Sequence, residues 1–197
     1  MTYAEAAPPV IRAFIAIEID SSARAALSRA QEKLKRSRAH VSWVPKDNLH
    51  ISLVFLGDVP VETVELLGEE VKNICFSRQP FQSCIENLGT FGKSTSPRVI
   101  WAGVGPNESL ANVQQQVSQC VQQAGVSLED RPYKAHVTLG RVRSSRGRNQ
   151  LLDAIAAMGA ISFGTVMVSR VVIMRSILGD SGATYRVMHA CPLGRES

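Results

Sequence analysis

The sequence predicts an α+β fold, a single domain of two similar lobes with largely antiparallel sheet. Three observations lead to this prediction. Apolar residues make up 45% of the 197-residue chain, which is enough for a packed core. Strand and helix patterns are mixed without a strict βαβα alternation, which favours antiparallel pairing. Each half repeats one order, a strand, a helix and then a strand that carries a histidine, so we expect a pseudo-two-fold duplication.

The first half of the chain is expected to contain two strands and two helices. The domain begins at residue 11, after a loose tail over residues 1–10, and continues as one unit over residues 11–197. An Ile-rich run indicates a buried strand, and Asp20 and Ser21 offer caps for the helix that follows. The predicted strands cover residues 12–19 and about 49–56, and the predicted helices cover residues 22–38 and 61–76.

The second half is expected to contain five strands and two helices. Asn107 caps a long helix that ends at Gly125. Loops are predicted for GTFGKSTSP at residues 89–97 and for the basic segment at residues 143–149, and a GDSG turn separates the last two strands. The predicted strands cover residues 81–88, 98–104, 133–142, 165–178 and 183–193, and the predicted helices cover residues 107–125 and 149–159.

Composition limits the classes of function. The formal net charge is +5 and the pI is about 9.3, a mild basic bias that suits an anionic ligand, nucleic acid included. Four widely spaced cysteines form no C-x-x-C pair, so we expect reduced thiols and a cytoplasmic protein. The first ten residues lack the pattern of a signal peptide, and no window approaches the roughly 20 apolar residues of a membrane span.

Two short phrases share one pattern. Residues 50–53 read HISL and residues 136–139 read HVTL, in each case a histidine, an apolar residue, a hydroxyl residue and an apolar residue. Alternate residues of a strand share a face. Each phrase should therefore present an imidazole and a hydroxyl on one wall while its apolar residues enter the core.

This arrangement suits acid–base chemistry. Histidine ionises near neutral pH, so two facing imidazoles can act as a base and an acid in one turnover. The hydroxyl groups of Ser52 and Thr138 can donate hydrogen bonds to an anion held between them. Cleavage of a phosphodiester needs these parts, namely an activated water, a protonated leaving oxygen and donors to the remaining phosphate oxygens.

Other interpretations are weaker. A single such phrase would be structural, but two copies in matching halves favour a site, whereas His40 and His189 lack the phrase and are interpreted as surface or core residues. No His, Asp or Cys stands at ligand spacing from the pair, so we expect no metal and no cofactor. Residues 89–94 read G-x-x-G-K-S, which lacks the spacing of a phosphate-binding P-loop.

The paired phrases resemble those of the 2H phosphoesterases. The similarity is greatest to the LigT-like RNA 2′,3′-cyclic phosphodiesterases, once described as 2′-5′ RNA ligases, and it covers nearly the whole chain. It rests on five segments, RAFIAIEI, WVPKDNLHISLVFLGDV, SPRVIWAGV, RPYKAHVTLGRV and SILGDSGATYRVM. The resemblance implies a bilobal fold whose two phrases line a central cleft. It also implies metal-free hydrolysis of a 2′,3′-cyclic phosphate to a 2′-phosphate.

The resemblance also implies roles for individual residues. His50 would be the general acid that protonates the departing 3′-oxygen, and His136 the general base that activates water. Ser52 and Thr138 would hold the phosphate oxygens, and Arg141 would help to bind the phosphate. The first phrase departs from the family pattern, because Ser52 stands where threonine is more common, although serine keeps the hydrogen-bond donor.

Further residues and functions remain open at this stage. Phe14 either stacks on a base or belongs to the core. The basic residues around the second phrase either guide an RNA backbone or form a solvated surface; they are Lys134, Arg143, Arg146 and Arg148. The partner expected is RNA with a 2′,3′-cyclic phosphate end, or a cyclic nucleotide, bound by a monomer. The alternatives are 2′-5′ RNA ligation, the reverse reaction at the same site, and an RNA-binding module without catalysis.

Overall fold

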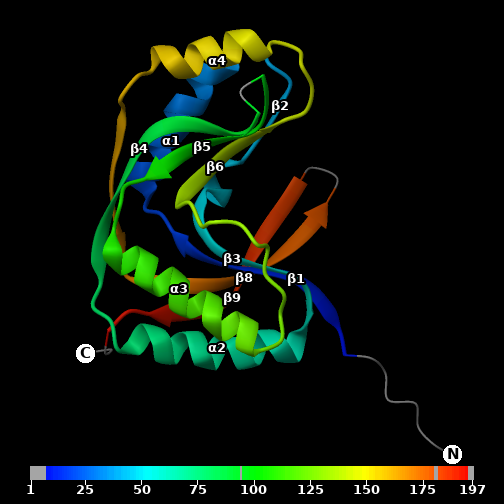
Figure 1. The fold of residues 1–197 in the computed structure, drawn as a ribbon, viewed down its shortest axis with the longest axis vertical. Coiled ribbons are helices and arrows are strands. Elements are labelled where there is room, and N and C mark those ends of the chain that lie inside the picture. Colours follow the sequence, from blue (N-terminus) through cyan, green and yellow to red (C-terminus); the bar gives the residue numbers. More distant parts are fainter. Residues whose placement is uncertain (1–7, 94, 180–181, 195–197) are drawn as a thin grey trace, which may run out of the picture.

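Nine antiparallel strands form one sheet in the structure, a computed structural model that describes residues 8–93, 95–179 and 182–194. The strand order is β7-β4-β5-β6-β3-β1-β8-β9, and β2 lies beside β6 (Figure 1). The strands are β1 (Val10–Glu18), β2 (Val41–Trp43), β3 (His50–Pro60), β4 (Phe81–Lys93), β5 (Ser96–Val104), β6 (His136–Val142), β7 (Ser162–Val168), β8 (Arg170–Gly179) and β9 (Gly182–Pro192). The helices are α1 (Ser21–Lys35), the short η1 (Lys46–Asn48), α2 (Val61–Phe76), α3 (Glu108–Gln123) and α4 (Arg148–Ala157).

The sheet consists of two matching halves. One half is β9-β8-β1-β3 and the other is β7-β4-β5-β6, so the two strands that begin with a histidine meet in the middle. A single residue pair, Ile51 opposite Val137, joins these two strands. The α+β prediction and the predicted duplication are therefore confirmed, and a single sheet passes through both lobes.

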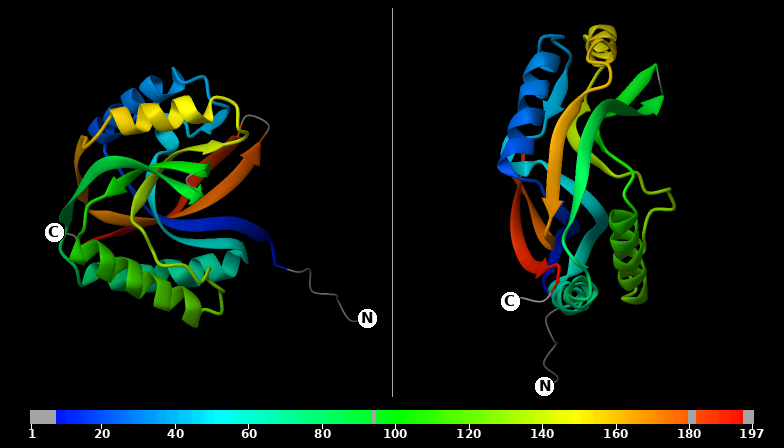
Figure 2. Two further views of the ribbon diagram at one scale, coloured as in Figure 1. Left: turned by 45° about the horizontal axis from the view of Figure 1, so that its top comes forward. Right: turned by 90° about the vertical axis from the view of Figure 1, so that its left-hand side faces the viewer.

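The helices are exchanged between the halves. α1 follows β1 but packs against β7 and α4, whereas α3 follows β5 but packs against β3 and α2. Figures 1 and 2 show α1 and α4 at one end of the molecule and α2 and α3 at the other. The buried side chain of Gln31 on α1 fixes this exchange, because it donates hydrogen bonds of 2.9 Å to the carbonyls of Val44 and Leu139.

The sheet separates a large core from a small apolar cluster. The helices bury their apolar residues against one face, where Ile15, Ile17 and Leu27 are at most 1% exposed. On the other face, Phe14, Ala16, Val172 and Met174 form a second cluster with Tyr185 against it. None of the helices in the described ranges has the length and apolarity that a bilayer span requires.

Several predicted boundaries are wrong. The run at residues 165–178 is not one strand but two, because β7 pairs with β4 while β8 pairs with β1 in the other half. Most of the loop predicted at residues 89–97 belongs to β4 and β5, and residue 94 lies outside the described residues. β2 was not predicted, and β3 continues past its predicted end.

The ends of the predicted elements also differ. The tail predicted at residues 1–10 is shorter, because β1 already begins at Val10, and residues 1–7 lie outside the described residues. β6 begins at His136, three residues after the predicted start. The GDSG turn is described only at its two glycines. The helix predicted at residues 61–76 has the predicted bounds.

Candidate active site

The two histidine phrases lie side by side where the halves of the sheet meet. Ile51 and Val137 pair across β3 and β6, and both are fully buried in the main core. Residues next to a buried strand residue face the opposite side of the sheet. His50 and Ser52 flank Ile51 and are half-buried, as are His136 and Thr138 around Val137. The structure therefore brings the four predicted side chains to one face.

Backbone carbonyls orient both imidazoles in the same way. Nδ1 of His50 lies 2.7 Å from the carbonyl oxygen of Asn48, and Nδ1 of His136 lies 2.7 Å from that of Lys134. A carbonyl oxygen only accepts hydrogen bonds, so Nδ1 carries the hydrogen in both rings. In each neutral imidazole the lone pair is then on Nε2, which can accept a proton. In each imidazolium, Nε2–H can donate one.

Aromatic rings surround His50 from two other strands. Phe14 on β1 stacks on the imidazole with a centroid distance of 4.8 Å, and Tyr185 on β9 meets the imidazole edge-on at 5.4 Å. Nε2 of His50 also lies 3.0 Å from the hydroxyl oxygen of Ser52. Phe14 is only 4% exposed, so it supports the imidazole from behind and is not itself presented to a ligand.

His136 has different neighbours. Phe91 on β4 meets its ring edge-on at 4.8 Å. The ammonium group of Lys134 lies 4.2 Å from the centroid of the Trp101 indole, a cation–π contact. The carbonyl of Lys134 holds the His136 ring, and its charge acts on the pKa of His136. Gly89 makes room for that indole, because a Cβ at Gly89 would collide with it.

Burial and nearby positive charge lower the pKa of both histidines. Loss of hydration is the main cause for each ring, and the hydrogen bonds to the backbone carbonyls oppose it. The positive charges of His136 and Arg24 also lower the pKa of His50, and those of Lys134 and Arg141 lower that of His136. The two imidazoles are therefore close enough to sense each other's charge.

The charge of Arg141, on β6, acts on groups from both halves of the site. Its charge acts on the pKa of His136 and also on that of the Tyr185 phenol, which burial raises. Tyr185 in turn contacts the ring of His50. Arg141 makes no ion pair within the described ranges, so its guanidinium is available to an anion at this face.

A cavity of about 140 Å³ opens beside His50. It is lined by Glu18, Arg24, Asp47, Asn48, Leu49, His50, Met174, Tyr185 and Val187. Arg24 and Tyr185 were not singled out from the sequence. Nε of Arg24 is buried without a hydrogen-bond partner among the described residues. Nothing in the sequence marks Arg24, because it looks like any exposed basic residue of an amphipathic helix.

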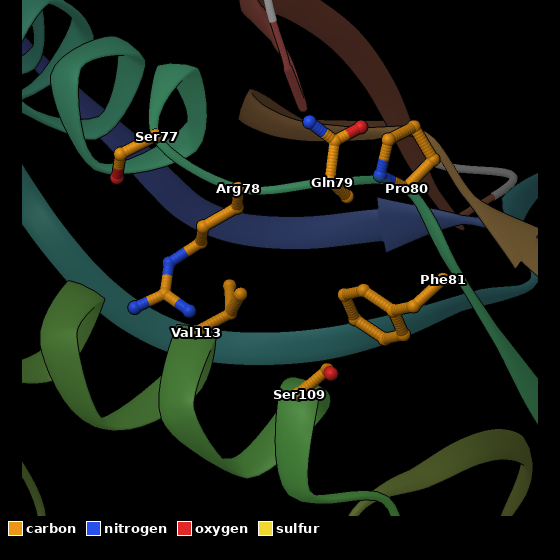
Figure 3. A pocket seen from close by; sticks show the side chains of 7 residues that line it. All are labelled: Ser77, Arg78, Gln79, Pro80, Phe81, Ser109 and Val113. Carbon is orange, nitrogen blue, oxygen red and sulfur yellow. The ribbon is translucent and has the colours of Figure 1, made fainter.

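A second cavity, of about 300 Å³, lies away from the histidines. It is lined by Ser77, Arg78, Gln79, Pro80, Phe81, Ser109 and Val113. Figure 3 shows it between the segment that follows α2 and the start of α3, with Arg78 and Phe81 pointing into the space. It includes neither phrase, and we assign it no part in catalysis.

The remaining candidates lie outside this constellation. His40 contacts the Ser144 hydroxyl at 3.2 Å, and His189 lies 3.1 Å from the Glu65 carboxylate. The chain in its described ranges contains no group of three or more His, Cys, Asp or Glu residues that could hold a metal ion. In the part of the chain that the structure describes, no hydrogen bond, ion pair or ring contact joins the four phrase residues to Arg143, Arg146 or Arg148.

A family model described as "LigT like Phosphoesterase" matches the chain over two segments, residues 17–101 and 104–185. Each segment contains one histidine phrase, in agreement with the duplicated fold. Together the two segments cover most of the chain.

Curated relatives and solved structures agree with this match. The chain is 33% identical to an RNA 2′,3′-cyclic phosphodiesterase of Methanothermobacter thermautotrophicus, over 90% of this chain and 96% of the relative. It is 32% identical to a protein of the same name from Archaeoglobus fulgidus, over 89% and 97%. The crystal structure of TT0787 from Thermus thermophilus superposes with a TM-score of 0.77 at 27% identity, over 94% of this chain and all of that one. E. coli LigT in complex with 3′-AMP has the same fold, with a TM-score of 0.79 at 21% identity, over 95% and 100%.

Proposed function

The chain belongs to the LigT-like phosphoesterase family, and we propose that it is an RNA 2′,3′-cyclic phosphodiesterase. The observation that carries the proposal is the pair of imidazoles on adjoining strands, each with Nδ1 held by a backbone carbonyl, so that Nε2 is the nitrogen that can exchange a proton. Relatives of that name, about 30% identical over most of the chain, support the choice of substrate.

The proposed reaction uses the two imidazoles in opposite ways. Nε2 of His136 accepts a proton from water while the water oxygen bonds to phosphorus. The bond between phosphorus and O3′ breaks, and O3′ takes the proton of Nε2–H of His50. The products are a 2′-phosphate and a free 3′-hydroxyl, and a proton passes from His136 to His50 through solvent before the next turnover. Acid–base assistance of this kind is worth about 10²–10⁴ in rate.

The surroundings of the histidines support this direction. His50 lies deeper than His136 and is held by Phe14 and Tyr185, as suits a group that must meet one fixed leaving oxygen. His136 is the more open ring, which suits a base that must admit water. The cations beside it, Lys134 and Arg141, would attract the phosphate.

The remaining polar groups would stabilise charge on the phosphate. Ser52 and Thr138 would donate hydrogen bonds to its non-bridging oxygens, and Arg141 would balance the charge that develops there. These groups and the two imidazoles supply every part that the reaction needs. We therefore propose that no metal ion takes part.

One digestion tests the proposal. Incubation with adenosine 2′,3′-cyclic phosphate should yield adenosine 2′-phosphate, identified by chromatography against both isomers. Activity should be unchanged in EDTA. A 3′-phosphate product would contradict the assigned leaving oxygen. Loss of activity in EDTA that zinc or magnesium restores would contradict the metal-free reaction.

A further inference from the structure

The positive charge of the chain is concentrated in two segments that are distant in the sequence. Residues 33–40 and 143–148 contain seven of the 22 Lys and Arg residues and none of the 17 Asp and Glu residues. Without these segments, acidic residues would outnumber basic ones. The seven cations are Lys33, Lys35, Arg36, Arg38, Arg143, Arg146 and Arg148.

The fold brings these two segments side by side. The backbone N–H of His40 donates to the carbonyl of Arg146 at 3.2 Å, and the N–H of Arg143 donates to the carbonyl of His40 at 2.8 Å. Gly147 lies so close to Ala39 that a Cβ at Gly147 would collide with the Ala39 backbone. The two segments therefore form one surface, here called the basic surface, at the end of the molecule that holds α1 and α4 (Figure 1).

Most of this charge has no counter-charge in the protein. In the part of the chain that the structure describes, only one of the seven cations is in an ion pair, Lys35 at 2.7 Å from Glu32. The other six side chains are exposed or half-buried. Like charges gathered in this way repel one another, whereas a bound polyanion would turn the repulsion into attraction.

Two of these arginines stand where arginine is locally unfavourable. Arg38 has a φ of 55°, in the left-handed region where glycine is preferred and a side chain costs free energy. Arg148 is the first residue of α4, whose first turn contains no acidic residue, so its charge opposes the helix dipole. Departures from local rules are typical of functional sites, and both of these place a guanidinium on the basic surface.

The basic surface is continuous with the phosphate site along β6. The pairing of β6 with β5 shifts register so that Leu139 has no partner, and one extra residue reverses the alternation of faces beyond it. Arg141 and Arg143 therefore share the face of His136 and Thr138, in agreement with the effect of the Arg141 charge on His136. Five residues of extended chain place Arg143 about 17 Å from Thr138.

We propose that the basic surface binds the backbone of an RNA chain whose cyclic phosphate end lies between the two imidazoles. This inference rests on the proposed function and names its substrate class, RNA ends in preference to free cyclic nucleotides. A mononucleotide is too short to reach the surface from the active site, but a chain of several nucleotides can place phosphates there. Lys and Arg bind phosphates without reading the sequence, so the surface adds affinity for RNA of any sequence.

The absence of apolar side chains favours RNA over an anionic membrane. Segments that bind bilayers combine cations with apolar residues that enter the lipid. Among the described residues, the large apolar side chains that are exposed include none from the basic surface. The continuity with the phosphate site through Arg141 also suits one polyanion that occupies both places.

The test uses two substitutions that remove charge but suit the local backbone. Arg38→Gly fits the left-handed conformation, and Arg148→Gln removes a cation from the start of α4, so neither should lower Tm. Each should weaken binding of a decaribonucleotide with a 2′-phosphate end, measured by fluorescence anisotropy. The expected loss is about fivefold in 0.1 M salt, because each phosphate contact of a single strand adds about −0.7 to the slope of log affinity against log salt.

The double variant should lose about 25-fold in affinity, and its salt slope should be shallower by about 1.4. Its KM for adenosine 2′,3′-cyclic phosphate should match the wild type, because this substrate does not reach the basic surface. Lys72→Gln is the matched control, since it removes one exposed cation from α2 at the opposite end of the molecule. This variant should bind the RNA as the wild type does.

The remaining outcomes would contradict the inference. Unchanged RNA affinity in an active double variant would overturn it while leaving the phosphodiesterase assignment intact, as would an equal loss in Lys72→Gln. Weaker binding of the double variant to phosphatidylserine vesicles, with RNA affinity unchanged, would assign the surface to a membrane. A wild-type protein that hydrolyses no cyclic phosphate would refute the proposed function instead.

Discussion

The two histidine phrases have the same backbone arrangement but different surroundings. In both, Nδ1 donates to the carbonyl two residues earlier, and the next residue is buried at the centre of the sheet. His50 then lies between two aromatic rings and bonds to the hydroxyl of its own phrase. His136 has one ring edge and two cations beside it, and no hydrogen bond joins it to Thr138 in the described structure.

This difference shows how a duplicated fold can supply two unlike groups. The strand pairing fixes the position and tautomer of each imidazole, and that part is common to both halves. Tyr185 and Phe91, which come from other strands, give the two imidazoles unlike ring contacts, and Lys134 and Arg141, which neighbour His136 in the chain, add positive charge in one half alone; that part has diverged. The same four-residue pattern can therefore serve as an acid in one half and a base in the other.

The largest expected effects come from testing the proposed acid and the proposed base separately. His50→Ala and His136→Ala should each lower kcat on a cyclic nucleotide by about 10²–10⁴. A nucleoside 2′-(4-nitrophenyl phosphate) needs no acid, because 4-nitrophenolate leaves unprotonated. On this substrate His50→Ala should recover much of its rate and His136→Ala should not. Recovery of His136→Ala alone would mean that the roles are reversed.

The hydroxyl groups offer a smaller test. Ser52→Ala and Thr138→Ala should each lower kcat, by at most the 10²–10³ that one donor to a transition-state anion is typically worth. Ser52→Thr keeps the donor and makes the first phrase more like the second, so steady-state assays should find it active. Thermal melts that match the wild type would show that folding is unchanged. An inactive Ser52→Thr would argue against equivalent hydroxyl roles.

The smallest expected effect concerns the residue that precedes each phrase by two positions. Lys134→Asn gives the second phrase the residue found before the first, and it keeps the carbonyl that orients His136. Since the charge of Lys134 lowers the pKa of His136, its removal should raise that pKa. A base works only above its pKa, so the acidic limb of kcat/KM should move to higher pH, as NMR titration of His136 should also show.

Salt and a distant charge provide the controls for Lys134. The difference between wild type and Lys134→Asn should shrink as salt screens the charge. Arg131→Gln removes a charge that is paired with Glu129 and is not among those that lower the pKa of His136, so the pH profile of this variant should match that of the wild type. An unchanged pKa in Lys134→Asn would mean that burial alone sets the ionisation of His136.

The sequence predicted elements that carry strong local signals. Apolar residues at helical spacing gave α2 its bounds, and the alternation within HISL and HVTL placed the histidines and hydroxyl residues on one face. The boundary between β7 and β8 was missed because Ser169 interrupts the apolar run without a glycine or proline. β2 has only three residues, too few for a period to be detected.

The surroundings of the site were less predictable because they depend on distant pairing. Phe14 was considered as a surface for a base, but the register of β1 with β8 and β3 buries it behind His50. Tyr185 and Phe91 reach the histidines only through the sheet order, which no local pattern encodes. The exposed position of Phe55 on β3 depends on a bulge at Leu53, whereas its local sequence looks like that of a regular buried strand.

The exchange of helices has a consequence for folding kinetics and for the origin of the chain. α1 lies near β1 in sequence but completes the opposite half, and α3 does the same in return. Contacts between distant parts of a chain slow folding, and here neither half is finished until the other has formed. A primitive chain of one half's length would have faced the same requirement. Two copies could have met it by trading helices as a swapped dimer, which gene duplication and fusion would turn into the single chain seen here.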